Sequence, residues 1–226
     1  MKNQQSLGGG ARRNLSLKGF TLAEVLITLA VIGVVAALTL PAVMTKVEKI
    51  VLKNQFKKVY SIYTTALQKT VFDMGGMPRC FYNIIPGADD WDFYEQSGCV
   101  EFYQKLLENM KVIKTCNSNA LADGCVPVYS AYAEIAGCSG YSEDRINNKN
   151  YAAILLDGSI FIAYDPLDMP GMPLFAVDVN GKKGPNTPGE DLFNLSIYKE
   201  GNKYSFSPTI GGCLMKKPIN VKDFLY

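Results

Sequence analysis

One acidic residue, Glu24, stands at the edge of the longest uncharged stretch of the chain. The 21 residues that follow it, 25–45, carry no charge. A carboxylate inside an apolar membrane helix costs about 2.5–3.5 kcal/mol on insertion scales, and less near the interface, so it calls for a cationic partner. The position therefore predicts a functional role for Glu24. The alternative is an interfacial residue one turn from a helix start, where negative charge suits the helix dipole.

A second set of polar residues could bind a metal ion. The segment VDVNGKKGPNTPGEDLF places oxygen ligands around a glycine-rich turn: Asp178, Asn180, Asn186, Glu190 and Asp191, with the carbonyl of Lys182 as a further donor. The loop departs from EF-hand spacing, because Gly181 comes too early and Lys182 and Lys183 dilute the negative charge. We hypothesise a calcium site here, and the alternative is a turn held by Asx-type side-chain bonds alone.

Six cysteines form the third set, and all lie beyond the apolar stretch: Cys80, Cys99, Cys116, Cys125, Cys138 and Cys213. If this part of the chain reaches an oxidising compartment, up to three disulfides are expected, with the pairing left open. A metal site made of these cysteines is disfavoured, because no pair has CxxC spacing and the chain contains no histidine.

Enzymatic chemistry finds little support in the sequence. Without histidine, the usual Ser-His and Cys-His arrangements are excluded. There is no nucleophile elbow, phosphate loop or dinucleotide fingerprint, and scattered acids alone do not make a glycosidase. The net charge of +2 gives no overall electrostatic case for nucleic acid. We therefore expect no enzyme and no required cofactor, with calcium as the one candidate ion.

The apolar stretch itself is long enough to cross a membrane, since a helix of 21 residues rises about 30 Å. Four basic residues and no acid precede the leader's end, namely Lys2, Arg12, Arg13 and Lys18, and this charge predicts a cytoplasmic N-terminus. Three lysines after the stretch weaken the charge contrast between its two ends: Lys46, Lys49 and Lys53. A cleaved secretory signal is the alternative. It is disfavoured because the stretch exceeds a signal h-region and continues into amphipathic helix.

These residues carry a family resemblance. The segment KGFTLAEVLITLAVIGVVAALTLPAV, with its basic leader ending in Gly19, resembles the N-terminus of type IV pilins and of the pseudopilins of type II secretion. The resemblance covers roughly the first 30 to 60 residues and makes Phe20 the first mature residue and Glu24 the fifth. Loops similar to the Asp/Asn/Gly segment above occur near the C-terminus of many pseudopilins and minor pilins, some of which bind calcium.

The resemblance implies cleavage between Gly19 and Phe20 by an inner-membrane prepilin peptidase, which also methylates the new N-terminus. The absent side chain of Gly19 gives a protease access to the scissile peptide. Cleavage would create a cationic amine on Phe20, and Glu24 of one subunit could then neutralise Phe20 of its neighbour. The mature chain would have 207 residues (226 − 19) and a net charge of −2 (2 − 4).

Two poor helix formers, Gly33 and Pro41, interrupt the apolar stretch. Pro41 lacks an N–H and crowds the carbonyl of Ala37, so the helix is expected to loosen or kink between them. We hypothesise a stretch that melts on assembly, and the alternative is an ordinary proline kink.

The elements after the membrane predict an α+β, pilin-like fold. Apolar residues at helical spacing continue the helix to about Asp73, before Gly75, Gly76 and Pro78. A tight type I′ hairpin at Asp157–Gly158 and further strands in LFAVDV and FNLSIYKEGNKYSFS predict an antiparallel sheet of about four strands packed on this helix. The expected parts are a leader (1–19), a transmembrane assembly half of the helix (20–45), an amphipathic half (46–74) and a disulfide-bonded head (75–226).

The sequence thus predicts a filament subunit, a minor pilin or pseudopilin of a type IV pilus or type II secretion-like system. Its expected partners are the prepilin peptidase, other pilin subunits, the inner-membrane assembly platform and, before assembly, membrane lipid. One alternative is a tip pilin that binds DNA or a surface through the region of Trp91, Phe93 and Tyr94. A membrane-anchored enzyme outside the cytoplasm is the less favoured alternative.

Overall fold

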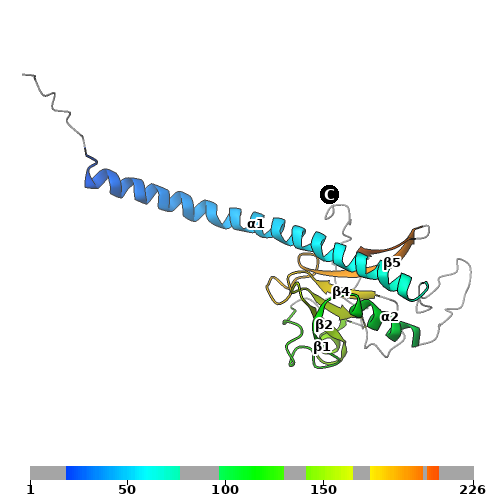
Figure 1. Cartoon of the computed structure of the whole chain (residues 1–226). Coiled ribbons are helices and arrows are strands. Elements are labelled where there is room, and N and C mark those ends of the chain that lie inside the picture. The colour runs from blue at the N-terminus through cyan, green and yellow to red at the C-terminus, as the bar shows by residue number, and fades with distance from the viewer. Residues whose placement is uncertain (1–18, 77–96, 130–140, 165–173, 201–202, 209–226) are drawn as a thin grey trace, which may run out of the picture. The chain divides into compact units, whose positions relative to one another are not determined.

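The structure is a computed structural model that describes residues 19–76, 97–129, 141–164, 174–200 and 203–208. The chain divides into two compact units, residues 1–46 and 47–226. One helix, α1 (Leu22–Asp73), begins in the first unit and ends in the second, and Figure 1 traces it from blue to cyan. The predicted end at Asp73 is confirmed. Gly75 and Gly76 follow with positive φ, and the Gly76 N–H caps the carbonyl of Val71 at 2.9 Å.

The second unit contains a six-stranded antiparallel sheet whose spatial order follows the chain, β1 to β6. Each strand pairs with the next one along the chain, so short connections suffice. The elements after α1 are α2 (Ser97–Glu108), β1 (Val112–Cys116), a π-helix η3 (Arg145–Lys149), β2 (Ala152–Leu155), β3 (Ile160–Ala163), β4 (Leu174–Asp178), β5 (Leu192–Glu200) and β6 (Lys203–Pro208).

The predicted helix on an antiparallel sheet is confirmed, and the sheet is larger than the four or so strands expected. The hairpin and both further segments are strands, β2 to β6. The additional strand, β1, lies in the middle region, where no strand was predicted. Three of its five residues are exposed and a register shift interrupts it between Val112 and Lys114, so its sequence lacks a clean alternation.

The turn between β2 and β3 differs from the predicted type I′ turn. Only Gly158 has positive φ (88°), whereas type I′ needs positive φ at Asp157 as well. The Gly158 N–H donates to the carbonyl of Leu155, and the Leu155 N–H donates to the carbonyl of Ser159. Asp157 instead accepts hydrogen bonds from the backbone and hydroxyl of Ser159. The turn is therefore one residue longer, with glycine alone in the left-handed region.

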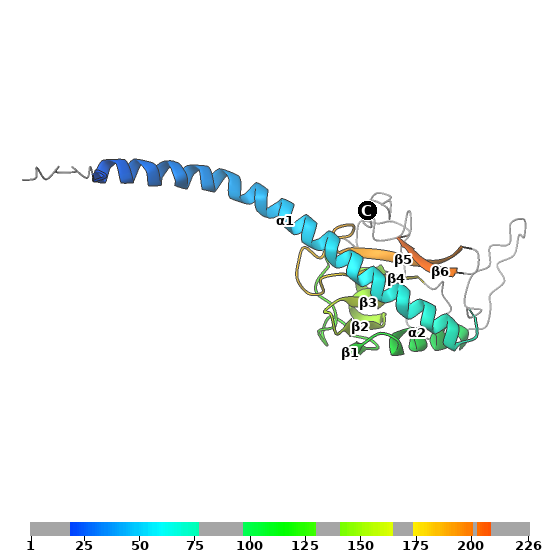
Figure 2. The same cartoon turned by 45° about the horizontal axis from the view of Figure 1, so that its top comes forward.

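One face of the sheet packs against both helices. The buried residues of α1 recur at helical spacing and form a single stripe: Phe56, Val59, Tyr63, Ala66, Leu67 and Thr70. Rings interlock across this layer, with the Phe56 and Phe193 centroids 4.6 Å apart and those of Tyr63 and Phe175 5.6 Å apart. Figure 2 shows the cyan part of α1 lying over the strands, with α2 beside its last turns.

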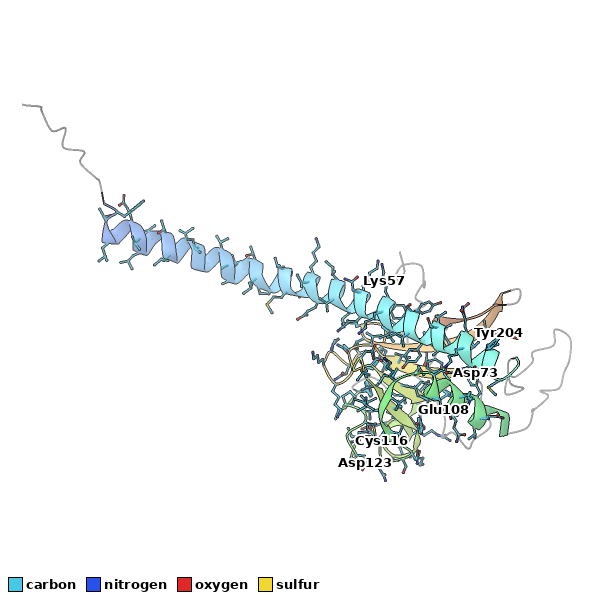
Figure 3. The ribbon with its side chains drawn as sticks, in the orientation of Figure 1. Lys57, Asp73, Glu108, Cys116, Asp123 and Tyr204 are labelled. Carbon is cyan, nitrogen blue, oxygen red and sulfur yellow. A yellow bond between two sulfur atoms is a disulfide. The ribbon has the colours of Figure 1, made fainter. Side chains whose placement is uncertain are left out.

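The opposite face of the sheet carries a second, smaller core. Alternate residues of the strands point into it, among them Ala152 and Ile162, where they meet residues of the 116–129 and 141–146 segments. A disulfide, Cys116–Cys125, closes the first of these segments. Figure 3 shows Cys116 and Asp123 close together on it. The expectation of disulfides is confirmed for this pair, which the sequence had not specified. The other four cysteines fall outside the residues whose side chains the structure describes.

Candidate functional site

The start of α1 places Glu24 in a reciprocal hydrogen-bonded cap. The Glu24 carboxylate accepts the Thr21 N–H and the Thr21 hydroxyl, both at 2.8 Å, and the Thr21 hydroxyl accepts the Glu24 N–H at 3.2 Å. This is a capping box, which satisfies donors that the first turn of a helix leaves free. Gly19 and Phe20 precede the first helical turn, and Phe20 is 90% exposed. The predicted cleavage site therefore lies just outside the helix.

The apolar half of α1 packs against no other described part of the chain. Every residue from 22 to 50 is exposed, among them Leu26, Ile32, Leu38 and Val43. Among the described residues, α1 is the one helix long and apolar enough to cross a membrane. Such a surface needs lipid or other protein around it, because water does not solvate it favourably.

The helix is continuous through Gly33 and Pro41. Hydroxyls near the proline bond back to helix carbonyls, from Thr39 to Val35 at 2.9 Å and from Thr45 to Pro41 at 3.1 Å. Such bonds occupy carbonyl lone pairs that water cannot reach in a membrane. The predicted melting concerns the assembled filament and stays a prediction.

The oxygen-rich loop connects β4 to β5 and brings two carboxylates together. Asp178 ends β4 and Asp191 immediately precedes β5, and both are fully buried. The Val179 N–H donates to the carbonyl of Asp191 at 2.8 Å, which closes the base of the loop. The strand register therefore brings Asp178 and Asp191 together at the base of the loop, although they are 13 positions apart in sequence.

Asp191 organises the loop through its backbone. Its two carboxylate oxygens accept the N–H groups of Asn186 and Thr187, each at 2.7 Å. Asn186 adopts positive φ (52°), which asparagine tolerates better than most residues. Asp178 accepts the N–H of Asn180 at 3.2 Å, and the Asn180 amide donates to the carbonyl of Gly184 at 3.0 Å. The Asx-type turn considered from the sequence is thus present.

Three oxygens of this loop have no hydrogen-bond partner among the described residues: Asp178 Oδ2, Asn180 Oδ1 and Asn186 Oδ1. Burial, and then the nearby charge of Asp191, raise the pKa of Asp178 to about 8, against the opposing hydrogen bonds from Asn180 and Tyr129. Burial likewise raises the pKa of Asp191. A buried carboxylate with a free oxygen, beside further free oxygens, is a chemical fit for a hard cation such as Ca²⁺.

The other predicted ligands are placed differently. The carboxylate of Glu190 lies on an exposed residue. Lys182 and Lys183 are exposed too, and the donor proposed at Lys182 is its backbone carbonyl rather than its side chain. The described part of the chain holds no group of three or more His, Cys, Asp or Glu side chains able to bind a metal. Any cation in this loop would therefore depend on amide and carbonyl oxygens beside the two buried aspartates.

The loop also rests on the β2–β3 turn through a glycine contact. Gly181 has positive φ (68°), and a Cβ built there would lie 2.2 Å from the carbonyl oxygen of Gly158. Two glycine turns therefore approach each other more closely than any side chain would allow. This contact links the oxygen-rich loop to the turn that carries Asp157.

Comparison with known proteins bears on the first of these two sites. Residues 17–40 match the family described as the prokaryotic N-terminal methylation motif. The chain carries a pilin-type methylation motif. No curated protein and no solved structure matches the chain. The resemblance to type IV pilins and pseudopilins is confirmed over the methylation motif, which ends within α1 and does not extend into the head.

Sequence reasoning missed three contributors to these sites. Thr21 belongs to the methylation motif segment and, with Glu24 three residues on, has the T-x-x-E spacing of a capping box, so this contact was readable. Tyr129, which lowers the pKa of Asp178, lies 49 residues from it in sequence, and no local pattern reveals the pair. The close approach of Gly181 to Gly158 likewise depends on tertiary packing.

Proposed function

We propose that the chain is a structural subunit of a type IV pilus or type II secretion-like filament, anchored in the inner membrane before assembly. The methylation motif carries the proposal, because it implies processing by a prepilin peptidase and assembly with other pilins. The exposed apolar half of α1 supports it, since this surface requires an apolar environment outside the chain. The proposed subunit is a minor pilin or pseudopilin, with its head outside the cytoplasm.

In the proposed mechanism, cleavage before Phe20 gives that residue a positively charged amine. Glu24, whose carboxylate is hydrogen-bonded to Thr21 in the single chain, then takes the amine of a neighbouring subunit as its ionic partner. Two oxygens allow Glu24 to keep a Thr21 contact while it accepts the amine. The pairing removes an uncompensated charge from the apolar surroundings of the packed helices.

The test replaces Glu24 with alanine and uses Glu48→Ala as the matched control on the same exposed helix. Glu24→Ala should abolish incorporation into filaments while the leader is still removed, as measured by shearing yield and intact mass. Glu48→Ala should assemble normally, because Glu48 lies beyond the apolar stretch. Normal assembly of the Glu24 variant would rule out this mechanism. The cleavage site is tested separately with Gly19→Tyr, which should leave the precursor uncut because the bulky side chain blocks the protease.

The proposed melting between Gly33 and Pro41 has its own test. In filaments, Pro41→Ala should restore the missing N–H to the helix and shorten the extension reached under a pulling force. Single-filament stretching measures this directly. An unchanged extension would favour an ordinary proline kink.

A calcium ion is the second part of the proposal, and the three unpartnered oxygens of the β4–β5 loop support it. Asp178 and Asp191 would supply the charge, and Asn180 and Asn186 would supply neutral oxygens. Bound calcium would neutralise two buried carboxylates and thereby stabilise the head. Glu190 and the carbonyl of Lys182 are the remaining donors proposed from the sequence.

Full-length protein in detergent, melted with millimolar calcium or with chelator, tests the ion. Calcium should raise the melting temperature of the wild type and should have no effect on Asp178→Asn. Asp123→Asn removes an exposed carboxylate elsewhere in the head and should keep the calcium response. A wild-type melting temperature indifferent to both calcium and chelator would exclude the site.

A further inference from the structure

A groove of about 590 Å³ lies between the head half of α1 and neighbouring segments of the head. Its walls come from three places: α1 itself, the connection from α2 to β1, and the β2–β3 turn. The Leu156 N–H donates to the carbonyl of Lys111 at 2.7 Å, which fixes the last two walls to each other. All of these segments belong to the same compact unit, residues 47–226.

The interior of this groove is mainly apolar. Ala66, Met110 and Leu155 are buried at its base, and Ile62 lines it from α1. Leu156, which is 63% exposed, adds a further apolar side chain to the lining. The groove therefore offers apolar area that nothing within the described part of the chain covers.

The rim of the groove is positively charged. It carries three lysines, Lys58, Lys69 and Lys111, against one acid, Asp157. Lys58 and Asp157 are 3.9 Å apart, and Asp157 already accepts two hydrogen bonds from Ser159. The nearby acids are also engaged, since Glu108 pairs with Lys105 at 2.8 Å and Asp73 accepts the Asn109 amide at 3.2 Å. The residues that line the groove therefore carry a net charge of +2 (3 − 1).

The lysines are spread along the groove. Lys58 and Lys69 are eleven residues apart on α1, a distance of about 16 Å along the helix axis. Hydroxyl groups from Ser61 and Thr65 line the helix between them. A complementary occupant would carry negative charge near both ends, apolar groups in the middle, and polar groups able to bond hydroxyls.

We propose that this lysine-rimmed groove binds an acidic amphipathic segment of a partner protein, with its apolar side chains on Met110, Leu155 and Leu156 and its carboxylates toward the rim lysines. A single-headed anionic lipid has charge at one end only and leaves the second end of the groove unmatched. Nucleic acid would place a polar, regularly charged backbone against mainly apolar walls. The proposal does not depend on the filament role, because the groove lies wholly in the head.

The experiment selects random peptides of about 12 residues, the helical length that spans the groove, on the mature full-length protein in detergent micelles. The groove variant is K58Q/K69Q/K111Q. The matched control, K49Q/K53Q/K57Q, removes the same charge from the same helix at residues that do not line the groove. Recovered peptides should be acidic with a central apolar run, and their affinity should fall at least about tenfold in the groove variant and less than twofold in the control.

A photoreactive residue at Leu156 should cross-link the selected peptides, whereas one at Ile113, which is 62% exposed outside the groove, should not. Peptides without acid enrichment, or equal loss in both lysine variants, would overturn the proposal. So would displacement of the peptides by vesicles of phosphatidylglycerol and phosphatidylethanolamine, or by short duplex DNA, with the same lysine dependence. In those two cases the groove would be a lipid or nucleic-acid site.

Discussion

Both halves of α1 carry many apolar residues, but within the described part of the chain only the head half buries them. In the head half, one stripe from Phe56 to Thr70 packs against the chain's own sheet. In the first half, side chains are exposed all round the helix. Packing of the head half on the sheet therefore requires only apolar residues at helical spacing, a pattern that many sequences satisfy. In the proposed filament the first half packs against neighbouring subunits, so its function would depend on particular residues at particular positions, such as Glu24.

The largest loss of stability should come from a leucine of the head half, Leu67, with Leu38 of the first half as its control. Leu67 is 0% exposed and Leu38 is 76% exposed on the same helix. Leu67→Ala should lower the free energy of unfolding of the head by about 2–5 kcal/mol, because it leaves a cavity against the sheet. Leu38→Ala should change it by less than about 0.5 kcal/mol. Denaturant unfolding of the full chain in detergent measures both, and equal losses would contradict the comparison.

The disulfide should come next. Replacing both Cys116 and Cys125 with alanine removes the bridge without leaving a free thiol. Their separation of 9 residues corresponds to a loss of about 2.5 kcal/mol of unfolding free energy in the chain-entropy model. The loss should appear in the unfolding of the head, while a spectroscopic signal confined to residues 22–46 stays the same. Unaltered unfolding would mean that the segment is held by the second core alone.

A smaller effect is expected at the glycine contact. Gly181→Ala should cost at least about 1–2 kcal/mol, because the residue has positive φ and its Cβ would meet the Gly158 carbonyl. Gly184→Ala, in the same loop, meets nothing within 4 Å and serves as the control. Thermal unfolding compares the two. If both substitutions are equally harmless, the loop does not rest on the β2–β3 turn as described.

The smallest effect should be the loss of one hydrogen bond between α1 and the sheet. The Tyr60 hydroxyl donates to the carbonyl of Phe206 at 2.6 Å. Tyr60→Phe should lower the unfolding free energy by about 0.5–1.5 kcal/mol, the usual contribution of one such bond. A loss as large as that of Leu67→Ala would show that the polar contact, rather than the apolar stripe, holds this half of α1 to the sheet.

The same comparison explains how far the sequence could be interpreted. The end of α1 at Asp73 could be predicted from local patterns, namely helical spacing followed by glycines. The role proposed for Glu24 also comes from a local pattern, a charge beside an uncharged run, and stays a prediction. The strands from β2 onward follow from alternation and turn residues. The helix α2 was missed although Phe102, Tyr103, Leu106 and Leu107 recur at helical spacing, because the region around them has many cysteines and loop-forming residues.

The oxygen-rich loop was predicted as a set of residues and not as a geometry. Asp178 and Asp191 were both named, and the strand register brings them together. Their complete burial depends on the second core, which includes Tyr129 and Leu192, and this packing has no signature near the loop. Glu190 is exposed and Asp191 is buried, but the sequence shows only two adjacent acidic residues and does not reveal which of them points into the loop.

The capping box at the start of α1 bears on what a processing enzyme would meet. Both of its residues, Thr21 and Glu24, lie on the mature side of the predicted cut, and the bonded groups of Thr21 include its own backbone N–H. Removal of the leader would therefore leave the first turn intact. Substrate and product would begin with the same folded helix, so a protease could work on a short free end without unwinding and re-forming the segment that the filament needs.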